Sequence, residues 1–254
     1  MKKFVLTIVF VLLSFLSANA QQEKGIIGFN SWLNNWTEFK PNKTEYNEPN
    51  QIITGTISVD SKLYKKNVYL LLGNVYVTNK AKLTIEPGTV IIGDSESKAA
   101  LIVAKGASII AEGTETDPII FTSNKSVRKA GDWGGILLLG DAPTNKFGST
   151  SSVNLDLDVA FASFGGVNAN SNSGILRYVR IEFAGAKVKG MGNFDALFLG
   201  GVGNQTVIDN VMISYSGGNS VAAFGGELNL NKLVSFKSSS NDFKFNYGTQ
   251  VNIK

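Results

Sequence analysis

The chain repeats a short strand-forming pattern once its first fifth is past. Runs of aliphatic and β-branched residues recur every 22 to 34 residues, and Gly, Asn, Asp and Ser separate them. The clearest copies are Val77–Glu86 and Val103–Glu112, which superpose at a shift of 26 residues. A unit of this length cannot bury its own apolar face, so it must stack on its neighbours. The pattern therefore predicts an all-β solenoid.

The repeat continues in the second half, where Val179 falls on Val211 at a shift of 32 and Val221 falls on Phe243 at a shift of 22. We expect a solenoid of parallel strands over residues 61–254, with about six coils. Residues 21–60 differ in composition and are expected to form a short N-terminal capping segment.

Alternation along one strand assigns its two faces. Val179, Ile181 and Phe183 should point into the solenoid, because successive side chains of a strand face opposite sides. Arg180 and Glu182 should then share an exposed outer face, where an ion pair contributes roughly 0–1 kcal/mol.

The first twenty residues have the composition of an export signal. Lys2 and Lys3 precede the apolar run Phe4–Leu16, and Ala18–Ala20 supplies small residues for cleavage. We predict cleavage after Ala20 and a secreted or cell-surface protein. No run reaches the ~20 apolar residues of a membrane span, so we do not expect an integral membrane protein.

The composition narrows the possible chemistry. The chain has no cysteine and no histidine, which removes disulfides, thiolate metal sites and the usual neutral-pH acid or base. Its 24 basic residues fall to 22 when Lys2 and Lys3 are removed, against 20 acidic residues. With no basic cluster, nucleic acid is not an expected partner.

Two tryptophans mark the N-terminal segment. Trp32 and Trp36 lie four residues apart, and Asn30 or Ser31 could cap a short helix that ends before Pro41. One interpretation is an aromatic platform for sugars. We favour the other, a lid over the open first coil, because the end of a solenoid exposes strand edges and apolar side chains.

Three stretches together resemble a known family: LTIEPGTVIIG at Leu83–Gly93, the run Leu101–Pro143 that contains GDWGGILLLGDAP, and NSNSGILRYVRIEFAGA at Asn170–Ala186. They are similar to secreted bacterial surface proteins with a right-handed parallel β-helix of the pectate-lyase-like shape. The resemblance runs from about Trp32 to the C-terminus. It implies this fold, export and a role at the cell surface, and it carries over no catalytic activity and no site residues.

The chain departs from that family at its end. The relatives usually continue into further coils or a C-terminal secretion or anchoring module, whereas Phe243–Lys254 stops within a strand pattern. Either the chain is truncated or a partner covers its last coil, and we favour truncation.

An enzyme on this fold would need a set of acidic residues. Asp156 and Asp158 would lie on one face of an extended strand, but Ca²⁺ takes six to eight oxygen ligands, and a solvated loop is the favoured interpretation. Asp195, Asp209 and Asp242 are single acids beside turns. No paired carboxylates of the kind used by glycoside hydrolases stand out.

The glycine-rich stretches are predicted to be corners. In Asp132–Gly135, Trp133 could stack on a ligand, but we favour a tryptophan packed over a tight turn. Gly200–Gly203 and Gly217–Gly218 open no helix, so they form no phosphate cradle.

These observations predict a non-catalytic exported module that acts at the cell surface, in adhesion or on glycans, with no catalytic, cofactor-binding or metal-binding residues. The alternative is a polysaccharide lyase or glycoside hydrolase acting on an acidic polysaccharide. The expected partner is a polysaccharide or another surface protein. Any binding is expected first at the long loop Asp141–Gly174, rich in Ser, Asn and Gly, and at the face beside it.

Overall fold

A computed structural model describes residues 31–253, so the predicted signal, its cleavage after Ala20 and residues 21–30 lie outside the described part. The chain divides into two compact units, residues 1–35 and residues 36–254.

Residues 32–36 form a turn in place of the expected helix. A short 3-10 helix, η2 (Pro41–Lys43), begins at the proline that was expected to follow that helix. Between residues 31 and 253, no helix is long and apolar enough to cross a membrane.

The second unit is built from strands. Sixteen of them belong to one sheet in which every pairing is parallel, while two small antiparallel pairs lie apart from it. The strands are β1 (Gln51–Ile57), β2 (Ser61–Leu63), β3 (Val68–Val77), β4 (Lys82–Ile85), β5 (Val90–Gly93), β6 (Ala100–Val103), β7 (Ser108–Glu112), β8 (Ile119–Ser123), β9 (Gly135–Leu139), β10 (Thr150–Ser152), β11 (Ser163–Gly165), β12 (Gly174–Glu182), β13 (Lys187–Val188), β14 (Gly192–Asn193), β15 (Leu197–Gly200), β16 (Val207–Ser214), β17 (Val221–Phe224), β18 (Glu227–Phe236), β19 (Phe243–Asn246) and β20 (Gln250–Ile253). A second 3-10 helix, η3 (Phe147–Ser149), precedes β10.

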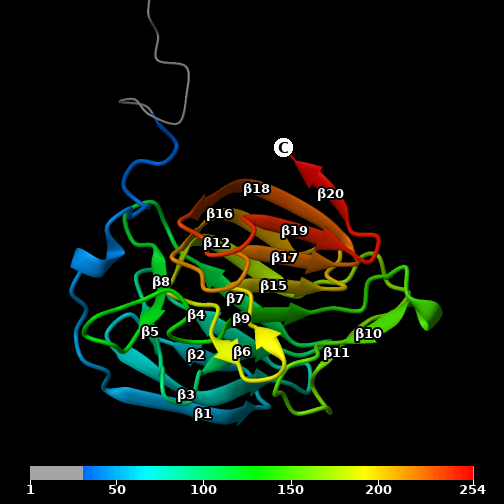
Figure 1. Cartoon of the computed structure of the whole chain (residues 1–254), viewed down its shortest axis with the longest axis horizontal. Helices are drawn as coiled ribbons and strands as arrows, with labels where there is room; N and C mark the ends of the chain where they lie inside the picture. The colour runs from blue at the N-terminus through cyan, green and yellow to red at the C-terminus, as the bar shows by residue number, and fades with distance from the viewer. Residues whose placement is uncertain (1–30, 254) are drawn as a thin grey trace, which may run out of the picture. The chain divides into compact units, whose positions relative to one another are not determined.

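The parallel pairings arrange the strands in three ladders. Figure 1 shows the successive coils as layers from β1 to β18. The first ladder runs through β2, β4, β7, the first halves of β12, β16 and β18, and β20. The second runs through the first halves of β1 and β3, then β5, β8 and the second halves of β12, β16 and β18. The third runs through the ends of β1 and β3, then β6, β9, β15, β17 and β19. This is the expected parallel β-helix.

The strand register confirms the repeats found in the sequence. Val77 pairs with Val103 at the shift of 26 residues. Val179 pairs with Val211 at 32, and Val221 pairs with Phe243 at 22. Equivalent side chains therefore lie one strand spacing apart along each ladder.

The long strands turn from one ladder to the next at single residues with positive φ. In β3 this residue is Gly73, but in β12, β16 and β18 it is Tyr178, Asn210 and Lys232, with φ of 49°, 51° and 48°. A second corner follows at Phe183, whose φ is 60°. Alternation stops there, so the expected inward position of Phe183 is wrong. Its buried ring lies outside both hydrophobic clusters and stacks on the Tyr215 ring, at 5.4 Å between centroids.

Two hydrophobic clusters stabilise this unit. The larger one fills the space inside the ladders and includes Leu83, Ile109 and Val179. The smaller one lies on the outer side of the third ladder, where Ile102 and Leu137 pack with Phe164 from the long loop. Part of this loop therefore packs on the solenoid and covers one outer face of the helix.

Residues 36–50 cover a side of the helix and not its first coil. Trp36 is fully buried, with its ring edge-on to Tyr178 at 5.9 Å. Arg128 Nη1 donates to the carbonyls of Pro41 and Thr44, at 3.1 and 2.7 Å. β1 stays largely exposed. Residues 36–50 therefore pack on the side of the helix, and the capping role expected of residues 21–60 as a whole stays a prediction. They hold Trp36 away from solvent, which rules out a sugar platform at that ring.

This segment also corrects the expectation that Arg180 and Glu182 lie on an exposed face. They are only 8% and 1% exposed. The Tyr46 hydroxyl donates to the Glu182 carboxylate, at 3.2 and 3.1 Å from its two oxygens, and accepts a hydrogen bond of 3.1 Å from Arg180 Nη2. Burial raises the pKa of Glu182 above its ordinary value, against the opposing charge of Arg180. Burial and the nearby Glu182 likewise raise the pKa of Tyr46.

Replacing Tyr46 with Phe should therefore lower the free energy of unfolding by about 1–3 kcal/mol, because buried Glu182 and Arg180 each lose a hydrogen-bond partner. The matched change Tyr64→Phe, at an exposed tyrosine, should alter it by less than about 0.5 kcal/mol. Urea unfolding measures both. Equal effects of the two changes would contradict this role of Tyr46.

Gly174 brings the chain back onto the first ladder after the long loop. It has a φ of 114° and pairs with Ile109, and an added Cβ would lie 1.8 Å from the Ile109 carbonyl oxygen. Only glycine fits where a backbone approaches this closely.

The change Gly174→Ala should cost about 3 kcal/mol or more of stability, because β12 must move away from β7. Gly190→Ala is the control. It also has positive φ, 81°, but nothing lies within 4 Å of the added Cβ, so it should cost only about 1–2 kcal/mol. Comparable unfolding midpoints for the two variants would show that the close approach is unimportant.

Candidate functional site

The Asp132–Gly135 corner is structural. Trp133 is fully buried in the core, and its Nε1 donates to the Glu182 carbonyl at 2.8 Å. Its ring stacks on Phe121 at 6.4 Å. Gly93 leaves room for it, since a Cβ there would lie 2.6 Å from the indole. The preferred interpretation of Trp133 as a packed corner residue is confirmed.

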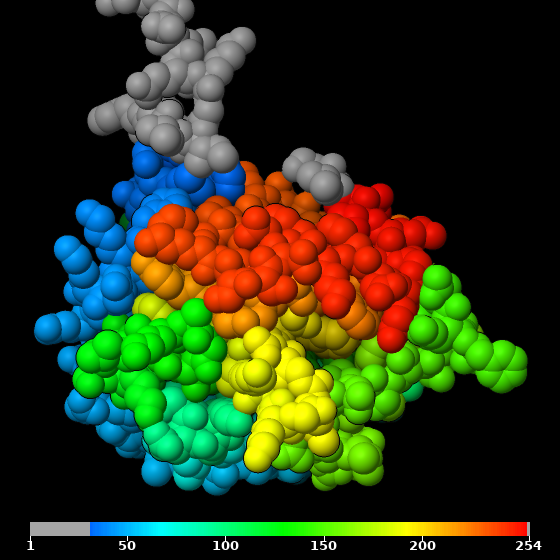
Figure 2. Space-filling model, in the orientation of Figure 1, coloured from blue at the N-terminus to red at the C-terminus, as the bar shows by residue number. Residues whose placement is uncertain are grey.

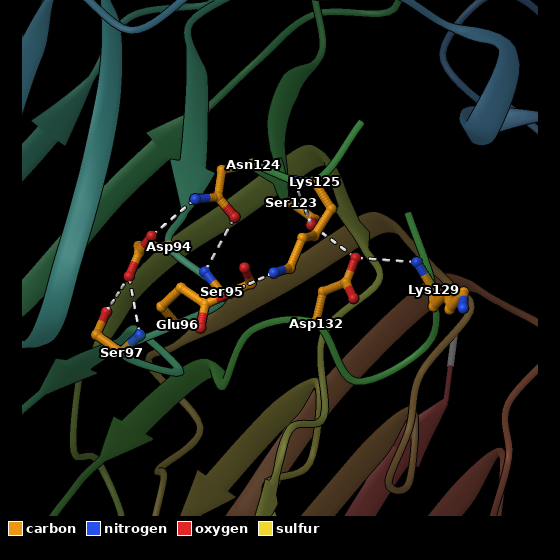
Figure 3. Close-up of polar contacts among 9 residues, drawn as sticks. All are labelled: Asp94, Ser95, Glu96, Ser97, Ser123, Asn124, Lys125, Lys129 and Asp132. Atoms are coloured by element: carbon orange, nitrogen blue, oxygen red, sulfur yellow. Dashed lines mark hydrogen bonds and ion pairs between the residues drawn. The ribbon is translucent and has the colours of Figure 1, made fainter. Parts of the chain in front are cut away.

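A dense polar network surrounds this corner (Figure 3). The Asp94 carboxylate accepts hydrogen bonds from Ser97 N at 2.8 Å and from Asn124 Nδ2 at 2.7 Å. Asp132 Oδ2 accepts from Ser123 Oγ at 2.7 Å and from the Lys129 N–H at 2.9 Å. Burial acts to raise the pKa of Asp94, but its hydrogen bonds outweigh this effect and lower it. These carboxylates are committed to bonds within the protein, so the network holds turns and leaves little for a ligand.

Asp156 and Asp158 lie exposed in the irregular stretch after β10, and not on the expected strand. Asp158 Oδ1 accepts a hydrogen bond of 2.9 Å from Ala160 N, as in a turn. Over residues 31–253, no three acidic, histidine or cysteine side chains come together as a possible metal site. The structure thus places this pair in a solvated loop.

The other predicted acids differ in their surroundings. Asp209 lies on the outer side of the first ladder, 3.4 Å from Arg177 Nε, and accepts a hydrogen bond of 2.8 Å from Asn231. Asp242 accepts one from Ser235 Oγ at 2.5 Å. Asp195 alone lines a cleft.

This cleft has a volume of about 390 Å³ and lies on the outer side of the third ladder. Figure 2 shows a recess between the yellow β13–β14 hairpin, the red C-terminal strands and the green loop. The long loop, the hairpin and the outer side chains of the ladder all contribute to its wall. The lining residues are Leu137, Ser152, Val153, Asn154, Leu155, Phe164, Met191, Asn193, Phe194, Asp195, Phe198, Gly218, Asn219, Phe224, Ser240, Lys244 and Tyr247.

Strand alternation builds the apolar floor of the cleft. Leu197 and Leu199 point into the core, so Phe198 between them points outward. Its ring contacts the Phe224 ring at 5.2 Å, and Phe224 in turn contacts Tyr247 at 4.8 Å. Aromatic rings from successive coils thus form a column along the floor.

Polar groups lie along one side of that floor. Asp195 Oδ1 accepts two hydrogen bonds from Asn219, one from N at 3.2 Å and one from Nδ2 at 2.6 Å. Asn219 Oδ1 accepts from Asn241 Nδ2 at 2.8 Å. Burial raises the pKa of Asp195 above its ordinary value, opposed by the bonds from Asn219 and by the charge of Lys244.

The loop was expected to be the first place for binding, and it does supply Ser152–Leu155 to the cleft. Asp195 was treated as a single acid beside a turn, so its place at the cleft was missed. A signal was present in the sequence: Asp195, Asn219 and Asn241 follow one another at shifts of 24 and 22 residues, the repeat of the ladder. The hairpin and the aromatic column required the folded chain.

Comparison with known proteins agrees with this fold. A search of curated proteins and a search of solved structures returned no match. A family model described as "Pectate-lyase like beta helix domain" matches residues 55–254. Over these residues, which form most of the chain, the protein belongs to the family of pectate-lyase-like β-helix domains.

Proposed function

We propose that this chain is a non-catalytic exported module that contacts polysaccharide through the cleft on the third ladder. The observation that carries the proposal is the make-up of the cleft, in which Phe198, Phe224 and Tyr247 line the floor beside Asp195 and Asn219. Apolar surface with a few convergent polar groups is typical of ligand sites. The pectate-lyase-like family makes a polysaccharide the natural ligand class.

The acid content of the cleft favours binding of a glycan over its hydrolysis. Among the described residues that line it, Asp195 is the sole carboxylic acid. Acid–base hydrolysis of a glycosidic bond commonly uses two carboxyl groups about 5–10 Å apart. A lone carboxyl group can accept a hydrogen bond from a sugar hydroxyl, but it cannot serve as both the general acid and the nucleophile or base.

The aromatic floor can be tested by substitution. Phe224→Ala should weaken binding to the best polysaccharide found on a glycan array by on the order of tenfold, since interface aromatics often contribute more than 1 kcal/mol. Phe243→Ala provides the matched control, because Phe243 lies on the same ladder, outside the cleft, and is 42% exposed. Calorimetry with the mature chain measures both affinities. The proposal fails at this site if Phe243→Ala weakens polysaccharide binding as much as Phe224→Ala does.

The lack of catalysis can be tested directly. Incubation of the mature chain with polygalacturonate, with and without Ca²⁺, should release no unsaturated product, because Ca²⁺ takes six to eight oxygen ligands and no three acidic side chains come together within residues 31–253. A known lyase is the positive control for the substrate. Sustained, Ca²⁺-dependent release would favour the alternative, a polysaccharide lyase.

A further inference from the structure

The Asp195 carboxylate has one oxygen in use and one available. Oδ1 accepts both hydrogen bonds from Asn219, whereas Oδ2 has no hydrogen bond to the described part of the chain. Lys244 lowers the pKa of Asp195 less than the hydrogen bonds from Asn219 do, and no ion pair joins the two side chains within residues 31–253. A partly buried carboxylate oxygen without a donor is a strong acceptor for a ligand.

The orientation of Asn219 fixes this arrangement. Its Oδ1 accepts from the backbone N–H of Asn241 at 3.2 Å and from Ser240 Oγ at 3.1 Å. A backbone N–H can only donate, so the amide oxygen of Asn219 must face Asn241 and its NH₂ must face Asp195. Donors thus run in one direction along this amide ladder, from Asn241 through Asn219 to Asp195, where the last residue needs only to accept.

We propose that the cleft binds a neutral sugar residue, whose hydroxyl groups donate to Asp195 Oδ2 while its ring lies over the aromatic floor. This inference rests on the proposed function, because it names the ligand class of the same cleft. Lys244 Nζ lies 5.6 Å from the centre of the Phe224 ring, where its N–H groups can donate to sugar oxygens. One carboxylate acceptor and one ammonium donor suit a ligand that offers both hydroxyl hydrogens and oxygen lone pairs.

A uronic acid fits the same position poorly. If its carboxylate lay beside Asp195, the two like charges would repel in this partly closed recess more strongly than in water, with Lys244 of the lining as the opposing cation. Its carboxylate also brings no hydrogen to Oδ2. The cleft therefore distinguishes neutral from acidic glycans through the one acceptor that the amide ladder leaves unfilled.

The change Asp195→Asn tests the inference with the least disturbance. The introduced amide can still turn its oxygen to Asn219, but it then presents NH₂ to the cleft in place of an acceptor. The probes are laminarihexaose, xylohexaose and mannohexaose as neutral oligosaccharides and hexagalacturonate as the acidic one, each titrated calorimetrically into the mature chain. We expect a neutral probe to bind, and Asp195→Asn to weaken it about ten- to hundredfold.

Two controls accompany the titrations. Asp209→Asn makes the same change on the first ladder and should leave the affinity unaltered. Urea unfolding of Asp195→Asn should match that of the unsubstituted chain, which separates loss of recognition from loss of fold.

The possible outcomes separate the inference from the proposed function. If hexagalacturonate binds in preference and Lys244→Met removes that binding, the cleft is a glycan site of the opposite class and the neutral-sugar inference is overturned. If a neutral probe binds equally well to Asp195→Asn, Asp195 is not the recognition residue. If no probe binds, the proposed function fails and the inference with it.

Discussion

The structure depends on parallel backbone pairing between coils in one constant register. Because Val77 pairs with Val103 and Val179 with Val211, each position of a coil lies directly over its equivalent in the previous coil. Side chains at equivalent positions therefore take the same role along the axis: aliphatic side chains fill the interior, and corner residues stack on corner residues. The floor of the cleft uses outward positions from successive coils, although its aromatic rings do not come from equivalent positions, since Phe198 pairs with Ala222 and Phe224 with Gly200.

The sequence was sufficient for the parts of the fold that follow periodicity. The 22-, 26- and 32-residue shifts predicted the register correctly, and the glycines around Trp133 correctly indicated a packed corner. The corners at Tyr178 and Lys232 could not be predicted, because residues other than Gly, Asn and Asp seldom adopt positive φ without support from neighbouring coils. Local preference is overruled here by the stacking of equivalent turns.

The outer surface was harder to predict. Alternation along a strand shows which side chains point outward, but it does not show whether another segment covers them. Arg180 and Glu182 do point away from the interior, yet the segment around Tyr46 buries them. In the same way, the loop that ends at Gly174 covers the third ladder and closes one wall of the cleft. Both arrangements place a segment that lies outside the repeat against an outer face of the ladders, and such contacts leave no periodic trace in a single sequence.

Because the amide ladder runs in one direction, the backbone just before β19 influences the geometry of the recess. Asp195 precedes β15, but its partner Asn219 is oriented by Asn241, which precedes β19, two coils further along. The backbone of that late coil therefore sets the geometry of an atom that it never touches. Loss of the pairing between β17 and β19 would therefore release the orientation of Asn219 on which the proposed selectivity of the recess depends.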